Sequence, residues 1–228
     1  MPPPLALTLT LLLIGYLLRR DFREVPRVSS AVWIPIAWLM INGSRQVSQW
    51  LGGDPTFSAQ VLEDGSPIDK AVYGALIVAG IWVLASRHVR VAEIARHNLW
   101  FVLLLLYEGV SVLWSDFPLI SFKRWSKALG DPVMVLVLWS DPFPVRAITA
   151  TIRRCAYVLI PLSLLFCKYY ENLGRTFDGW GHFSYTGVTT DKNMFGYLLF
   201  AFGLFFVAAF MRSLDPHRDE REDRKSVV

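Results

Sequence analysis

Seven apolar segments, joined by loops of varied length, constrain the fold of this 228-residue chain more than any other feature. So many apolar runs with so little charge between them favour lipid surroundings over a soluble core. Several are shorter than the ~20 residues of a perpendicular span, so we expect interfacial Trp, Tyr or Arg to complete their ends. We predict an all-α, polytopic transmembrane helical bundle of about six to seven spans over residues 1–211. The segments are 5–18, 29–41, 71–86, 98–115, 118–140, 155–167 and 193–211.

Composition and charge support the same class of protein. Residues are 54% hydrophobic and 18% charged, and the nine Trp and eight Tyr suit a chain with two membrane–water interfaces. The formal net charge is +4, but the basic residues lie between apolar runs and indicate topology rather than a phosphate-binding face for nucleic acid. We therefore expect the lipid bilayer, and no nucleic acid, as a partner.

The loops alternate in charge, which predicts their sides of the membrane. Basic loops are expected in the cytoplasm, together with a charged, disordered tail over residues 212–228. The acidic loop 42–70, the corner at 114–118 and the stretch 168–192 then lie on the outer side. The basic loops are 19–28, 87–97 and 141–154.

Cofactor chemistry has no support in the sequence. Cys155 and Cys167 are predicted in one helix, roughly 18 Å apart at ~1.5 Å per residue, too far for a disulfide. Neither has metal-ligand spacing, and no phosphate-binding glycine loop or metalloprotease motif is present. We expect neither a cofactor nor a metal.

The first candidate site follows the corner Trp114-Ser115-Asp116-Phe117-Pro118. The residue before a proline favours extended geometry, so one helix should end here. Pro118 suits the first turn of the next helix, with Ser115 and Asp116 as cap-type residues.

That new helix places polar residues on one face, at offsets of three, three and four. Arg124 is the strongest phosphate ligand among them, because a guanidinium forms bidentate contacts. Lys127, like its neighbour Lys123, can instead extend its ammonium group to the lipid headgroups. Asp131 either pairs with Lys127 or marks a kink before Pro132. The four residues of this face are Ser121, Arg124, Lys127 and Asp131.

Glu108 lies inside an apolar segment. A carboxylate there should find a partner in the bundle, and Arg124 or Lys127 is expected. Alternatively, Glu108 lies in a polar cavity and only stabilises packing.

The second candidate site is residues 168–196, whose glycines, aromatic residues and cations predict a loop. Thr189, Thr190 or Asp191 can cap a helix that begins near Asn193 and directs its N-terminus at an anion. An ordinary polar loop followed by a capped helix explains the pattern equally well. His182 is either an acid/base group or a surface histidine.

The chain resembles the O-antigen ligase / exopolysaccharide polymerase superfamily of bacterial inner-membrane proteins. Residues 114–124 resemble that family's WSxxPxxSxxR pattern, and residues 161–175 resemble its tyrosine–glycine–arginine stretch. TGVTTDKNMFG at 186–196 resembles its TGxTxxKNxxG segment. NGSRQVSQWL at 42–51 is similar to GSRxxSxWL of the exopolysaccharide-type members.

The resemblance implies transfer of a glycan from undecaprenyl pyrophosphate to a lipid or saccharide acceptor on the periplasmic side of the inner membrane. It implies no cofactor, and it leaves ligase and polymerase open. Arg124 and Arg175 match arginines thought to hold the pyrophosphate leaving group. The other expected substrate-binding residues are Arg45, Trp114, Ser115, Ser121, Lys127, Tyr169, Tyr170, Thr189, Lys192 and Asn193.

Family members are about twice as long, so the resemblance covers the front half of the family architecture. We therefore expect the chain to be inactive alone and a second polypeptide to supply the rest. The alternative is a non-catalytic membrane protein that binds or transports lipid-linked polysaccharide.

Overall fold

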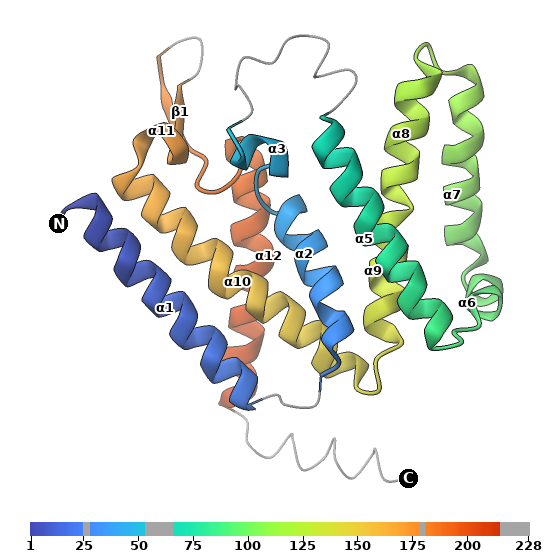
Figure 1. The fold of residues 1–228 in the computed structure, drawn as a ribbon, viewed down its shortest axis with the longest axis horizontal. Coiled ribbons are helices and arrows are strands. Elements are labelled where there is room, and N and C mark those ends of the chain that lie inside the picture. Colours follow the sequence, from blue (N-terminus) through green and yellow to red (C-terminus); the bar gives the residue numbers. More distant parts are fainter. Residues whose placement is uncertain (25–27, 53–65, 178–180, 215–228) are drawn as a thin grey trace. The chain divides into compact units, whose positions relative to one another are not determined.

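The computed structural model describes residues 1–24, 28–52, 66–177 and 181–214, most of them helical (Figure 1). The all-α prediction is confirmed, with one short β-hairpin added. Unit 2 comprises residues 19–151, and unit 1 comprises residues 1–18 and 152–228. Each unit is described by itself below.

Unit 2 packs around a contact of three helices. Trp38, Tyr73 and Met134 form its buried cluster, and the Trp38 and Tyr73 rings meet edge to face at 5.0 Å. Two glycines permit this approach: a Cβ at Gly80 would meet Val133, and one at Gly130 would overlap the Trp38 ring. The elements are η1 (Ser30–Val32), α2 (Trp33–Asn42), α3 (Val47–Trp50), α5 (Pro67–Ser86), α6 (Val91–His97), α7 (Leu99–Ser111), η2 (Val112–Trp114), α8 (Pro118–Ala128) and α9 (Gly130–Trp139).

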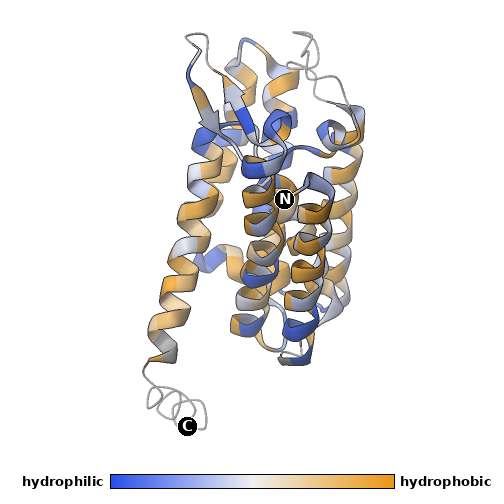
Figure 2. Ribbon diagram, turned by 90° about the vertical axis from the view of Figure 1, so that its left-hand side faces the viewer, coloured by the Kyte–Doolittle hydropathy of each residue, from blue (hydrophilic) through white to orange (hydrophobic). Residues whose placement is uncertain are grey.

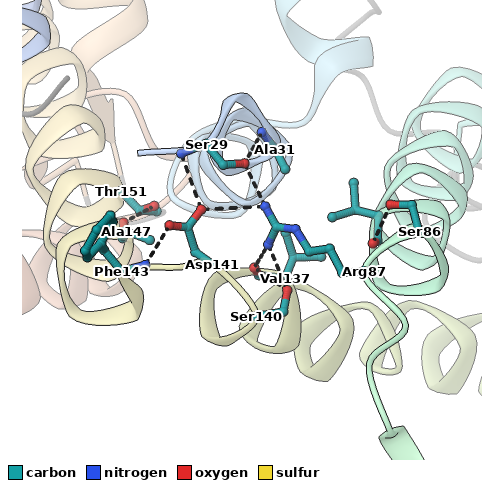
Figure 3. A network of polar contacts seen from close by, with 11 residues as sticks. Ser29, Ala31, Ser86, Arg87, Val137, Ser140, Asp141, Phe143, Ala147 and Thr151 are labelled. Carbon is teal, nitrogen blue, oxygen red and sulfur yellow. Dashed lines mark hydrogen bonds and ion pairs between the residues drawn. The ribbon is translucent and has the colours of Figure 1, made fainter. Parts of the chain in front are cut away.

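A polar network joins three segments at one end of unit 2 (Figure 3). Arg87, which caps the C-terminus of α5, donates to Ser29 Oγ at 2.7 Å, to Ser140 Oγ at 2.8 Å and to Val137 O at 3.1 Å. Its guanidinium is also 3.6 Å from the Asp141 carboxylate, whose side chain is fully buried. Asp141 in turn accepts from the amides of Ser29 and Phe143.

Unit 1 contains the start of α1 (Pro3–Glu24), most of α10 (Pro144–Tyr169), α11 (Glu171–Gly174), β1 (Arg175–Phe177), β2 (Phe183–Tyr185) and α12 (Lys192–Ser213). The strands form an antiparallel hairpin in which Phe177 faces Phe183. The segment after the hairpin is buried, and Ser163 Oγ of α10 accepts from the amide of Val188. Apolar residues occur along the whole of α12 (Figure 2).

Three described helices are long and apolar enough to cross a membrane: α5, α10 and α12. A fourth is possible if α6 and the residues 99–114 that follow form one span, which is bent by 100°. The structure thus confirms apolar helices that can span a membrane, but not the predicted number of six to seven.

Two predicted spans have different bounds in the structure. Residues 118–140 form two helices, because Pro132 has no amide hydrogen to donate to the carbonyl of Ala128. The predicted span 155–167 belongs to α10, which already begins at Pro144. The basic stretch taken as a loop is therefore largely helical, and Arg154 is buried in it. α12 continues to Ser213, and residues 215–228 of the predicted tail lie outside the described residues.

Candidate anion-binding site

The corner before α8 ends one helix and begins another, as predicted, but its capping differs. Residue 117, not Ser115 or Asp116, occupies the N-cap position of α8, and no side chain caps it. Ser115 Oγ accepts from the amide of Phe117 at 3.2 Å and lies 2.7 Å from Ser121 Oγ. Both serines therefore stabilise the turn.

The predicted polar face of residues 121–131 is divided in the structure. Arg124 and Lys127 line one pocket, Ser121 bonds to the corner, and Asp131 lies beyond the interruption between α8 and α9. Asp131 Oδ1 accepts from Trp38 Nε1 at 2.8 Å, and no ion pair with Lys127 is formed among the described residues. The one-face prediction is wrong because the helix does not continue through Leu129.

A pocket of about 500 Å³ opens between α5 and α8 in unit 2. Its lining contains four cationic side chains and one acidic one, so a positive charge is concentrated in it. The charged residues are Lys70, Lys123, Arg124 and Lys127, with Asp69; Gln46, Ser66, Ser126 and Tyr73 add polar groups. An excess of cations in a partly enclosed site attracts anions.

The acidic residue of this pocket is already satisfied. Asp69 is buried and accepts from both the amide and the hydroxyl of Ser48, at 3.0 Å and 2.5 Å. It anchors α3 to the start of α5. Asp69 therefore reduces the positive charge of the pocket without obstructing its opening.

Lys127 is held at the inner side of the pocket. Its ammonium lies 4.1 Å from the centre of the Tyr73 ring, and Tyr73 donates to Asn42 Oδ1 at 2.9 Å. This lysine supplies a fixed positive charge that is partly withdrawn from water.

Arg124 and Lys70, like Lys123, are exposed cations of the pocket. The side chains of Arg124 and Lys70 form no hydrogen bond or ion pair with any residue that the structure describes. They lie on α8 and at the start of α5 respectively, so an anion between the two helices can be reached from both walls. Lys70 was not predicted as a site residue.

Arg45 and Trp114 do not line the pocket. The Arg45 guanidinium lies 5.9 Å from the Trp50 ring, and burial lowers its pKa. Trp114 is exposed, with its ring 6.3 Å from that of Tyr107. Both contacts are typical of interfacial anchoring.

The second candidate segment, in unit 1, is more ordered than the predicted loop. Arg175 Nε donates to Cys167 O at 3.0 Å, its guanidinium pairs with Glu171 at 2.7 Å, and it lies 5.5 Å from the Tyr185 ring. The arginine thus joins α10, α11 and the hairpin, and its side chain remains 25% exposed. The alternating R-T-F and F-S-Y segments were the missed signal for two strands.

The other predicted residues of unit 1 differ in accessibility. Asp191 caps α12, because its carboxylate accepts from the amides of Asn193 and Met194 at 2.7 Å and 3.1 Å. Of the three predicted caps, Thr189, Thr190 and Asp191, the structure thus uses Asp191. Lys192 and Asn193 are exposed, whereas Thr189 is buried and donates to Thr186 O.

The two tyrosines near the end of α10 also have structural contacts. The Tyr169 ring lies 5.5 Å from the Lys168 ammonium. Tyr170 donates to Pro3 O at 3.3 Å. Both remain candidates for substrate contact, and neither is deeply buried.

Glu108 does not lie as expected, whereas His182 agrees with the surface alternative. Glu108 is exposed and forms no ion pair with the described residues, so the predicted pairing with Arg124 or Lys127 is wrong. The reason is that α7 buries none of its residues. His182 is exposed.

Gly174 determines how α11 and the hairpin approach α10. A Cβ at this position would overlap the backbone of Phe166, and Gly174 O accepts from the amides of Thr186 and Gly187. We expect Gly174→Ala to reduce the free energy of unfolding by about 3 kcal/mol, because backbone cannot move aside as a side chain can. Gly196→Ala is the control: nothing lies within 4 Å of its Cβ, so stability should be unchanged or slightly raised.

Thermal unfolding followed by tryptophan fluorescence compares these two glycine variants. Equal transition temperatures would contradict the close approach at Gly174.

Comparisons with protein-family models, curated proteins and solved structures find no match to the chain.

Proposed function

We propose that the pocket between α5 and α8 binds the pyrophosphate of an undecaprenyl-pyrophosphate-linked glycan, and that the chain takes part in transferring this glycan. The observation that carries the proposal is the concentration of four cations against one satisfied carboxylate. Arg124 is accessible and can form a bidentate contact with a phosphate group. The three apolar helices agree with a substrate held in a bilayer.

The transfer proceeds by attack of an acceptor hydroxyl oxygen on the anomeric carbon of the glycan. A new C–O bond forms, the bond to the pyrophosphate oxygen breaks, and a base takes the hydroxyl proton. Cations at the leaving group lower the barrier because they stabilise charge that develops in the transition state. Arg124 supplies this charge in the pocket of unit 2. The role of Arg175, in unit 1, as a second catalytic arginine rests on the resemblance alone.

The resemblance supports the further parts of this proposal. They are a bundle of about six to seven spans in a bacterial inner membrane, a site on the periplasmic side, and a second polypeptide that completes the enzyme.

Complementation tests the proposed activity. A strain lacking its surface-glycan ligase or polymerase would receive this chain alone, or this chain with the product of the neighbouring reading frame. We expect surface glycan to be restored by the pair. Restoration by the chain alone would show that no second polypeptide is needed, and failure of both, with membrane insertion confirmed, would contradict transfer.

In the strain that is restored, we expect Arg124→Ala and Arg175→Ala to lower the amount of surface glycan by about tenfold or more, since a charge-assisted hydrogen bond is lost. Lys123→Ala should lower the amount of surface glycan less. The exposed Lys123 ammonium is one of four positive charges in the pocket, and the other three remain in this variant. Quantitative glycan staining with matched protein levels measures this order. Small and equal effects from all three would contradict it.

A non-catalytic role is the second candidate, and one observation favours it. The single carboxylate that lines the pocket in the described part of the chain accepts two hydrogen bonds from Ser48, and no histidine lies beside it. A site without an available base binds a lipid pyrophosphate but does not activate an acceptor. Binding without restoration in any arm of the complementation would select this role.

A further inference from the structure

A second cavity of unit 2, of about 1050 Å³, lies between α7 and α9 and is closed at one end by α6. Its lining shares no residue with the cationic pocket, so it is a separate site. The walls are mainly apolar: Phe101, Val102 and Leu105 from α7, and Val135, Leu136 and Trp139 from α9. The polar lining residues are Arg90, Glu93, His97 and Asn98 near α6, and Asp131 at the start of α9, whose carboxylate accepts from Trp38 Nε1. The apolar stretch between them offers water no polar partner.

The groove runs along the helices rather than across them. On α9 it extends from Asp131 to Trp139, eight residue steps or roughly 12 Å at ~1.5 Å per residue. Half of a hydrocarbon core of ~30 Å is ~15 Å. The length of the groove therefore matches the depth of one lipid leaflet.

The end at α6 has the properties of a membrane interface. α6 makes an angle of 100° with the helix that follows, so it lies along the surface when α7 points into the bilayer (Figure 1). Its residues Val91, Ile94 and Ala95 line the groove.

The charged residues of α6 give this end a cationic character. Arg90, the N-cap residue of α6, lines the groove and pairs with Glu93 at 3.1 Å. Arg96 is exposed on α6 and adds a positive charge, although it does not line the groove. His97 also lines the groove. The excess of cations is complementary to an anionic headgroup.

We propose that the groove between α7 and α9 holds an acyl chain of an anionic glycerophospholipid, whose phosphate lies at Arg90, the N-cap residue of α6, and Arg96 of α6. An apolar space open to a bilayer is filled by hydrocarbon, since an empty space loses dispersion contacts and water finds no polar partners there. Lipid held in this way stabilises α7, which buries no residue against the other described helices. The proposal does not depend on the cationic pocket.

The test uses the full chain in nanodiscs that contain phosphatidylglycerol with a photoreactive acyl chain. After irradiation, mass spectrometry locates the labelled peptides, which we expect within residues 91–105 and 131–139. Phosphatidylcholine with the same acyl chain should label these peptides less. Arg90→Gln with Arg96→Gln should remove the difference between the two lipids.

Val135→Trp places a large side chain in the groove and should reduce labelling there by about tenfold. The indole displaces two or three methylene groups of the acyl chain, and the loss of their burial has an effect of this size on affinity. Val78→Trp is the matched control, since Val78 is also exposed on a helix but lines neither cavity. Val102→Trp fills the opposite wall and should repeat the loss, so the test stands if Val135→Trp does not fold.

Three results would overturn the proposal. They are unchanged labelling in both filled variants, equal labelling by the two lipids in the wild-type chain, and cross-linked dimers through this groove in place of lipid adducts. Displacement of phosphatidylglycerol by undecaprenyl phosphate at equal concentration would overturn it as well, since the occupant would then be an isoprenoid.

Discussion

Removal of Arg124 and Lys70 together is expected to weaken binding of undecaprenyl pyrophosphate by about a hundredfold or more. Each contributes a charge-assisted contact worth about 1.5–3 kcal/mol, and about 1.4 kcal/mol is a factor of ten. Both side chains are exposed and make no hydrogen bond or ion pair with the described residues, so Arg124→Ala with Lys70→Ala should leave the fold intact. Titration of the purified chain in nanodiscs with the lipid measures the change in Kd.

The control for this double variant removes two cations elsewhere. Arg19→Ala with Arg23→Ala changes the net charge equally, and neither residue lines the pocket. We expect less than a threefold change in Kd, from the general field of the protein alone. Equal losses in the two double variants would contradict a defined site, because general charge would then explain the binding.

Replacement of Asp141 by alanine is expected to cause the largest loss of stability, about 3 kcal/mol or more. Its carboxylate is fully buried and accepts from two amides, and its removal leaves the Arg87 guanidinium without its counter-charge. For a chain of this size, such a loss lowers the transition temperature by roughly 10 °C. Thermal unfolding in detergent, followed by tryptophan fluorescence, measures it.

Glu93→Ala is the comparison for Asp141→Ala. Glu93 pairs with Arg90, but their side chains are 53% and 84% exposed. An exposed pair contributes about 0–1 kcal/mol, so the transition should move by only a few degrees. Similar shifts for the two variants would show that the network of Figure 3 is not a stabilising contact.

Local features of the fold could be predicted from the sequence because they depend on neighbouring residues. The proline of the 114–118 corner ends one helix and begins another, and Asp191 caps α12. Both follow from backbone chemistry within a few positions. The two cysteines, predicted too far apart for a disulfide, are free within α10.

Features that depend on tertiary packing could not be predicted. Lys70 and Arg124 line one pocket although 54 positions separate them, and no periodic pattern connects them. Glu108 was assigned a partner because its segment is apolar, yet Glu108 is exposed and no residue of α7 is fully buried in the described structure. The interruption at Leu129 depends on the close fit of Gly130 against Trp38 as well as on Pro132.

We propose that a lipid pyrophosphate occupies the pocket between α5 and α8. The most direct measurement is photo-cross-linking with undecaprenyl pyrophosphate that carries a photoreactive group beside the diphosphate, followed by mapping of the modified peptides. We expect modification within residues 66–77 and 120–127, the segments that contribute to the pocket, and its loss when unlabelled lipid is added in excess. Modification confined to other peptides, or labelling that excess lipid does not reduce, would contradict it.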